Sequence, residues 1–176
     1  MQGIIIYKGK YGATQQYAEW LGQELNLPVS ASDEINEKAL NKYDFLVIGT
    51  SVYIGKLQME SWLKHNLPFI IGKKIFFYQV AGTPVELREK RQSYNETGIP
   101  NELKPNCEFY FLPGKMIMKD LTWKDRLMLK MGAMLTKNPV EKKTMLTNYD
   151  NVAKTHIKEM LAAVKNSFEK QPFPVY

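Results

Sequence analysis

The regular alternation of strand-like and helix-like segments is the feature that most constrains the fold. Short apolar runs typical of buried strands are separated by polar segments whose apolar residues recur at helical spacing. Such alternation indicates βαβ units, and therefore a parallel sheet with helices on both faces. The strand-like runs cover residues 4–7, 29–31, 43–49, 74–78 and 107–112.

Five strands in this sequence favour the doubly wound α/β architecture with strand order 2-1-3-4-5. A chain of 176 residues is long enough for one such domain. We expect the domain to cover residues 1–170, and residues 171–176 to form a loose tail. Residues 114–147 exceed the connection that the fold needs after its fifth strand, so they predict a helical insertion before the last helix. Pro28 and Pro68 are expected to end the first two helices.

Composition indicates a cytoplasmic protein. No apolar run approaches the ~18 residues needed to cross a bilayer, and the N-terminus lacks the features of a secretory signal. The single Cys107 excludes an internal disulfide and is predicted to be a buried, inert thiol. His65 and His156 lie on predicted helices and are interpreted as surface or structural residues, so no metal site is expected.

The loops that follow the first, third and fourth strands are the expected binding site, because ligands of open parallel sheets bind beyond the carboxyl ends of the strands. In the first loop, glycine and a helix N-terminus favour a phosphate, although an ordinary turn with a helix cap is the alternative. Its candidate residues are Lys8, Gly9, Lys10, Tyr11, Gly12, Ala13 and Thr14.

The second and third loops contain residues suited to a flat ring. Tyr53 could stack on such a ring or pack under the following helix. The small residues of the third loop leave room for the ring and offer backbone N–H groups. The candidates are Thr50, Ser51, Val52, Tyr53, Ile54 and Gly55 in the second loop, and Val80, Ala81, Gly82 and Thr83 in the third.

The strand followed by Gly12-Ala13-Thr14 at the start of a helix resembles the phosphate loop of flavodoxins. This resemblance implies a flavodoxin-like fold and FMN as a non-covalent cofactor. The chain departs from the family pattern at Gly9 and Tyr11, which stand where residues with a hydroxyl on a short side chain are usual. Two side-chain hydrogen bonds to the phosphate are therefore expected to be replaced by backbone amides or a lysine.

Residues 123–130, Trp-Lys-Asp-Arg-Leu-Met-Leu-Lys, resemble a stretch of bacterial menaquinone-dependent protoporphyrinogen IX dehydrogenases, which are flavodoxin-like enzymes of haem synthesis. Residues 43–55 also match that family, except that Tyr53 stands where the family often has arginine after a serine and a hydrophobic residue. The resemblance implies an FMN oxidoreductase that acts on a porphyrinogen-like substrate.

The predicted insertion is basic and rich in methionine. Residues 115–143 hold eight basic and three acidic side chains, nearly all of the net charge of +6, and six of the nine methionines lie between Met116 and Met145. An amphipathic helix over 121–135, capped by Thr122, could pack on the sheet edge with its lysines in solvent. It could instead form a lid that receives a flat acidic substrate, or touch a membrane that holds quinone. The candidate substrate or partner residues are Lys115, Trp123, Arg126 and Lys130.

Three functions remain open from the sequence. The first is an FMN oxidoreductase with a small-molecule substrate. The second is a flavodoxin-type electron carrier to a redox protein, but such carriers are usually acidic and this chain is basic, which favours the enzyme. The third is a domain that has lost FMN and binds a protein partner. Nucleic acid is not an expected partner, because no base-stacking motif accompanies the charge.

Overall fold

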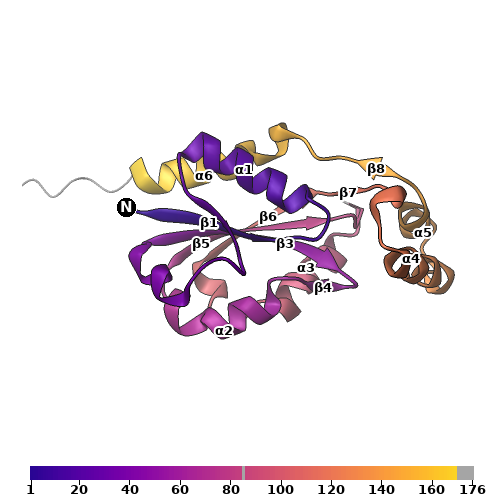
Figure 1. Ribbon diagram of the computed structural model, residues 1–176, viewed down its shortest axis with the longest axis horizontal. Coiled ribbons are helices and arrows are strands. Elements are labelled where there is room, and N and C mark those ends of the chain that lie inside the picture. The colour runs from indigo at the N-terminus through magenta and orange to yellow at the C-terminus, as the bar shows by residue number, and fades with distance from the viewer. Residues whose placement is uncertain (85, 170–176) are drawn as a thin grey trace, which may run out of the picture.

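The computed structural model describes residues 1–84 and 86–169. Five parallel strands form the central sheet in the order β2-β1-β3-β5-β6, and the short β4 pairs antiparallel with β3 (Figure 1). This is the predicted flavodoxin-like α/β architecture, with the predicted strand order. The strands are β1 (Gly3–Lys8), β2 (Val29–Ala31), β3 (Phe45–Tyr53), β4 (Lys56–Leu57), β5 (Lys74–Ala81) and β6 (Cys107–Pro113).

Helices cover both faces of the sheet and create two apolar cores. On one face, α1 (Ala13–Leu25) and α6 (Lys158–Glu169) pack on side chains such as Ile5 and Val47. On the other, α2 (Glu60–Ile70) and α3 (Arg88–Gly98) pack on side chains such as Ile6 and Ile48. Alternate side chains of a strand point to opposite faces, so apolar runs such as 4–6 fill both cores. Short 3₁₀ turns occur at Glu37–Lys42, Lys104–Asn106 and Lys154–Ile157.

The third strand is longer than the sequence predicts. It continues to Tyr53 because β4 folds back onto it, with Val52 opposite Leu57. Ile54 and Gly55 both have positive φ at this turn. The predicted second loop is therefore the end of a strand and a tight hairpin.

The prediction that Pro68 ends the second helix is wrong. Pro68 lies inside α2, which continues to Ile70. The first helix ends before Pro28, where Asn26 takes the left-handed conformation and its N–H bonds the carbonyl of Gly22. The partly buried Cys107 is the first residue of β6, and burial raises the pKa of its thiol to about 12, as expected of an inert cysteine. The predicted tail, 171–176, lies outside the described residues.

The insertion folds as two helices on a small two-stranded base. β7 (Lys115–Met116) pairs antiparallel with β8 (Tyr149–Asp150), and residues 117–148 between them are called the cap below. The cap contains a 3₁₀ turn (Met118–Asp120), α4 (Trp123–Leu135) and α5 (Pro139–Leu146). As predicted, the Thr122 hydroxyl caps α4; α5 was not predicted. Figure 1 shows both cap helices beyond the carboxyl ends of the strands.

Within the described residues, no helix is both long enough and apolar enough to cross a membrane.

The close contact between Gly49 and Tyr78 links the sheet to α1. A Cβ atom on Gly49 would lie 2.1 Å from Cζ of Tyr78, whose buried hydroxyl donates a hydrogen bond of 3.1 Å to the backbone carbonyl of Thr14. Gly49→Ala should therefore displace the ring and lower the free energy of unfolding by about 1–3 kcal/mol, measured by urea denaturation. Gly132→Ala is the control, because its Cβ would have only ordinary contact with Met145, at 3.7 Å. An undiminished stability of Gly49→Ala would contradict the steric argument.

Candidate functional site

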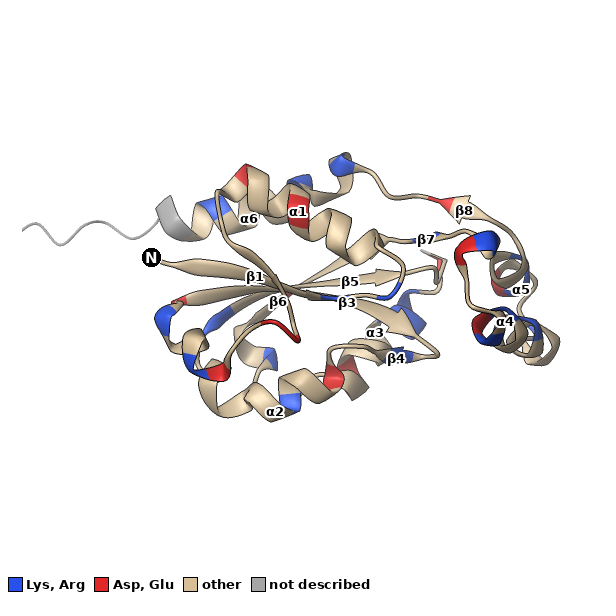
Figure 2. Cartoon of the chain, in the orientation of Figure 1, with Lys and Arg blue, Asp and Glu red and all other residues tan. Residues whose placement is uncertain are grey.

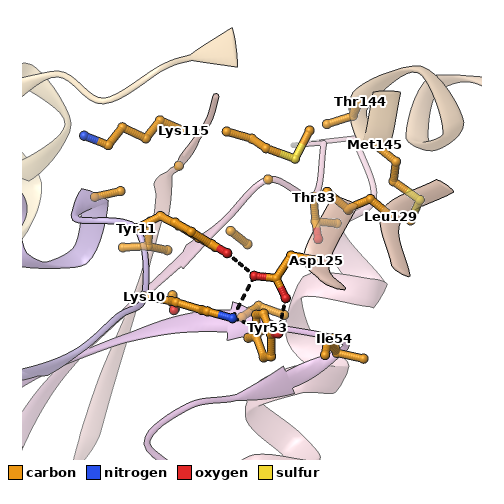
Figure 3. A pocket seen from close by; sticks show the side chains of 18 of the residues that line it. Lys10, Tyr11, Tyr53, Ile54, Thr83, Lys115, Asp125, Leu129, Thr144 and Met145 are labelled. Carbon is orange, nitrogen blue, oxygen red and sulfur yellow. Dashed lines mark hydrogen bonds and ion pairs between the residues drawn. The ribbon is translucent and has the colours of Figure 1, made fainter. Parts of the chain in front are cut away.

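A cavity of about 420 Å³ lies between the carboxyl edge of the sheet and the cap. Its volume falls within the range of roughly 300–1,000 Å³ that small-molecule and cofactor sites occupy. All three loops that the sequence singled out contribute to its wall, and the inner side of the cap forms the rest (Figure 3).

The start of α1 offers an unsatisfied donor set to this cavity. Gly12 adopts φ 80° at the N-cap, no side chain caps the helix, and its first turn holds no acidic residue. The Thr14 hydroxyl is buried without a hydrogen-bond partner among the described residues, and Thr14 lines the cavity. Free backbone N–H groups, the helix dipole and this hydroxyl together favour an anion.

The Lys115 ammonium group lies close to the start of α1. Its Nζ lies 3.8 Å from the position that a Cβ atom on Gly12 would occupy, and it forms no ion pair with a described residue. Lys115 comes from β7, at the base of the cap, so the insertion itself supplies a charge to the first loop. The sequence had placed Lys115 among the substrate residues, whereas the geometry sets it beside the predicted phosphate loop.

A single carboxylate joins the cap to the sheet edge. Asp125 of α4 accepts hydrogen bonds from Lys10 Nζ at 2.7 Å, from Tyr53 Oη at 2.5 Å, and from the hydroxyl of Tyr11 (Figure 3). Lys10 and Tyr11 belong to the first loop and Tyr53 ends β3. The Asp125 side chain is almost completely buried, so its charge depends on these three donors.

The pKa shifts of Asp125 and Lys10 keep this pair ionised at neutral pH. Burial raises the pKa of Asp125, but the hydrogen bonds from Lys10, Tyr11 and Tyr53 outweigh burial and hold it below its usual range. The hydrogen bond to Asp125 raises the pKa of Lys10 above its usual value. The stabilisation from Asp125 is thus fully present above about pH 4 and is lost as the pH falls through its lowered pKa. That from Lys10 is present below about pH 10 and is lost as the pH rises through its raised pKa.

Tyr53 lies in the cavity wall, where its side chain also contacts the cap. Its hydroxyl binds Asp125, and Lys10 Nζ lies 4.4 Å from the centre of its ring. In the third loop, Gly82 lies directly against Tyr149 of β8, because a Cβ atom on Gly82 would fall 1.8 Å from the tyrosine oxygen. Burial raises the pKa of Tyr149 to about 12. An aromatic side chain from the insertion therefore closes this end of the cavity.

Fourteen of the predicted site residues line the cavity. They are Lys10, Tyr11, Ala13, Thr14, Ser51, Val52, Tyr53, Ile54, Gly55, Val80, Ala81, Gly82, Thr83 and Lys115.

The other predicted residues lie outside the cavity wall. Thr50 is buried, and its hydroxyl accepts a hydrogen bond from the Met59 amide at the start of α2. The exposed Lys8 and the two glycines Gly9 and Gly12 shape the first loop without lining the cavity. Three predicted substrate residues of the cap are exposed and not part of the wall: Trp123, Arg126 and Lys130.

The residues that sequence reasoning missed belong mostly to the cap. Asp125 is the most consequential, since it lay inside the quoted 123–130 stretch and was not assigned a role. The sequence feature that could have identified Asp125 is that it is the single acidic residue in a helix of otherwise basic and apolar residues. The cap side of the cavity is largely apolar, with wall residues that include Leu121, Met128, Leu129 and Met145. No group of three His, Cys, Asp or Glu side chains in residues 1–84 and 86–169 could hold a metal ion.

Comparison with known proteins agrees with this arrangement. The model of the flavodoxin domain family matches residues 4–143. This chain belongs to the flavodoxin-domain family. The match covers the three loops, the α1 N-terminus and most of the cap.

Individual relatives are distant. An uncharacterized protein of Methanocaldococcus jannaschii is 27% identical over 101 residues, which are 53% of this chain and 67% of that protein. Oxidised Flavodoxin 2 from Bacillus cereus superposes with a TM-score of 0.53 at 14% identity, covering 96% of this chain and all of that one. A flavoprotein from Lactobacillus acidophilus, solved in complex with FMN, has a TM-score of 0.46 at 13% identity, covering 64% and 91% of the two chains. The Bacillus cereus structure supports the fold.

Asp125→Asn should loosen the cap, because the amide keeps the shape of the side chain but loses the charge that binds Lys10. We expect a loss of about 1–3 kcal/mol for this contact. Hydrogen–deuterium exchange of the α4 amides should rise by roughly tenfold or more, while exchange in β3 and β5 stays unchanged. Asp120→Asn is the matched control, because Asp120 is an exposed acid just before the same helix. Equal protection of α4 in the two variants would show that Asp125 does not hold the cap.

Proposed function

We propose that this flavodoxin-domain protein binds FMN at the carboxyl edge of its sheet. The observation that carries the proposal is the buried, unpartnered Thr14 hydroxyl at an uncapped helix N-terminus. Membership of the flavodoxin-domain family and a cavity of cofactor size support it. One such loop fits the single phosphate of FMN, so FMN is preferred to FAD.

The groups that would hold the phosphate are the N–H groups at the start of α1, the hydroxyl of Thr14 and the ammonium of Lys115. The loops at Ser51–Gly55 and Val80–Thr83 would flank the ring. FMN, when bound, supplies the capacity to accept and pass on hydride or single electrons. The protein's own contribution is to bind and orient it and to exclude water with the cap.

Thr14→Val tests the phosphate site. The structure gives the hydroxyl no partner, so its removal should leave the stability of the free protein unchanged or slightly higher. The dissociation constant for FMN should rise about tenfold to a hundredfold, because a hydrogen bond to a charged group contributes roughly 1.5–3 kcal/mol. Quenching of FMN fluorescence on titration with protein measures the affinity.

Ser32→Ala is the matched control, since Ser32 carries another buried hydroxyl without a partner among the described residues but lies outside the cavity wall. It should leave FMN affinity unchanged. FMN affinity equal to wild type in Thr14→Val would contradict the assigned phosphate site, and failure of the wild-type protein to bind at micromolar concentration would contradict the cofactor itself.

We propose further that the protein is an oxidoreductase whose substrate enters between FMN and the cap. A carrier needs an exposed flavin edge for its partner, whereas here the cap covers the cavity mouth. The inner cap residues Leu121, Met128, Leu129 and Met145 suit a bulky, largely apolar molecule. The resemblance of residues 123–130 to protoporphyrinogen IX dehydrogenases favours a porphyrinogen as that molecule.

Removal of the cap tests the substrate proposal. Replacing residues 117–148 with a short Gly-Ser turn would close the β7–β8 hairpin and keep Lys115 and Tyr149. FMN should still bind, but reduction of the flavin by protoporphyrinogen should be lost because its binding wall is gone. Bleaching of the flavin absorbance under anaerobic conditions follows the reaction, and the FMN spectrum is the control for folding.

Equal rates in the intact and cap-deleted proteins would show that the cap takes no part in the reaction. The electron-carrier alternative has its own signature: no reduction by porphyrinogen in either protein, together with rapid electron exchange with a ferredoxin or its reductase.

A further inference from the structure

The outer surface of the cap is unusually apolar for a surface that faces solvent. Among the described residues, thirteen large apolar side chains are exposed, and eight of them lie between 123 and 146. On α4, five are between 51% and 82% exposed: Trp123, Leu127, Met131, Met134 and Leu135. On α5, Val140 and Leu146 are also exposed. Contiguous exposed apolar surface of this kind marks an interaction site.

Four of the exposed side chains on α4 form a stripe that is distinct from the cavity wall. Trp123, Leu127, Met131 and Met134 follow the i, i+4, i+8, i+11 spacing of one helix face. Asp125, Leu129 and Gly132 line the cavity from another face of α4, so the exposed stripe and the cavity wall use different faces of this helix. The packed side explains the cap's attachment to the domain. The exposed stripe is not needed for it.

Between residues 121 and 146, acidic side chains of the cap contact the body of the protein, whereas basic side chains are exposed. The two acids of this stretch bond to the body of the protein: Asp125 to the first loop and β3, and Glu141 to Lys90 of α3. The six basic residues of this stretch are all exposed: Lys124, Arg126 and Lys130 on α4, Lys142 and Lys143 on α5, and Lys137 between the two helices. Figure 2 shows basic residues on both cap helices. The outer surface therefore combines apolar side chains with positive charge and has no competing acid between 121 and 146.

On α4 the cations border the apolar stripe on both sides. At 100° per residue, Lys124 lies beyond the Met131 edge of the stripe, while Arg126 and Lys130 lie beyond the Trp123 edge. Long basic side chains beside an apolar face, with tryptophan and leucine on that face, are typical of helices that lie in the interface of a bilayer.

We propose that the outer surface of the cap binds the surface of an anionic lipid bilayer. Leu127, Met131, Met134 and Trp123 would enter the boundary between headgroups and acyl chains. The flanking lysines and Arg126 would contact acidic headgroups. This surface lies outside the cavity, so the proposal goes beyond the cofactor and substrate functions and does not depend on them.

Vesicle flotation with the full chain tests the proposal. The probes are vesicles of phosphatidylcholine alone and of phosphatidylcholine mixed with phosphatidylglycerol. We expect binding to the mixed vesicles at low salt, weak binding to the neutral ones, and a loss of binding as salt screens the charges. Tryptophan emission should shift to shorter wavelength in the wild-type protein on vesicle addition, and the shift should disappear in Trp123→Phe.

Two double variants separate the apolar and electrostatic contributions. Leu127→Gln with Met131→Gln should weaken binding to mixed vesicles by at least about tenfold. Lys124→Gln with Lys130→Gln should weaken it by roughly fivefold for each lysine at low salt, and should reduce the salt dependence. The matched controls are Ile71→Gln, at an exposed apolar residue after α2, and Lys38→Gln with Lys42→Gln, on the Glu37–Lys42 turn. Both controls should bind as the wild type does.

The proposal is overturned if the wild-type protein does not bind mixed vesicles at low salt, or if Leu127→Gln with Met131→Gln binds as the wild type does. Equal binding to neutral and anionic vesicles would overturn the electrostatic part, and with it the choice of an anionic membrane. Sedimentation velocity without lipid measures the oligomeric state of the protein and tests the remaining alternative. A wild-type dimer that this apolar variant abolishes, without vesicle binding, would assign the surface to a second copy of the chain. Because none of these measurements requires FMN, failure here is distinguishable from failure of the cofactor proposal.

Discussion

The ionised carboxylate of Asp125 is the contact on which the arrangement of the site depends. A buried charge is tolerated only when hydrogen bonds replace its lost hydration, and three donors from two separate segments do so here. Those donors fix where α4 can lie relative to the first loop and the end of β3. The cavity between them follows from that position, since its far wall is the rest of the cap.

This contact also gives a physical account of the two departures from the flavodoxin phosphate-loop pattern. At position 9, a Cβ atom would lie 2.6 Å from Oγ1 of Thr14, so Gly9 leaves space for this buried hydroxyl. At position 11, the tyrosine hydroxyl is directed to Asp125 rather than to an anion. In this loop, Gly9 leaves space for Thr14, and Tyr11 contacts the cap. Lys115, which the cap region contributes, lies beside Gly12.

The cap is therefore built with two different sides. Two acids of the cap, Asp125 and Glu141, and several of its apolar residues face the body of the protein, where they are bonded or line the cavity. Its cations and a second set of apolar residues face outward. Sequence periodicity alone suggested a single amphipathic helix with one apolar face. Because α4 lines the cavity with the face that carries Asp125 and Leu129, three residues predicted to bind substrate lie outside the cavity wall: Trp123, Arg126 and Lys130.

The sequence by itself determined the elements whose cause is local. Buried strands, helical spacing, the Thr122 cap and the meeting of three loops at one sheet edge all follow from residue type and period. Tertiary structure decided what depends on distant partners. β3 reaches Tyr53 because β4 folds back on it, and Lys10 meets Asp125 across 115 positions of the chain. Periodicity shows that a helix has an apolar face, but not which face becomes buried, because that is set by the surface against which the helix packs.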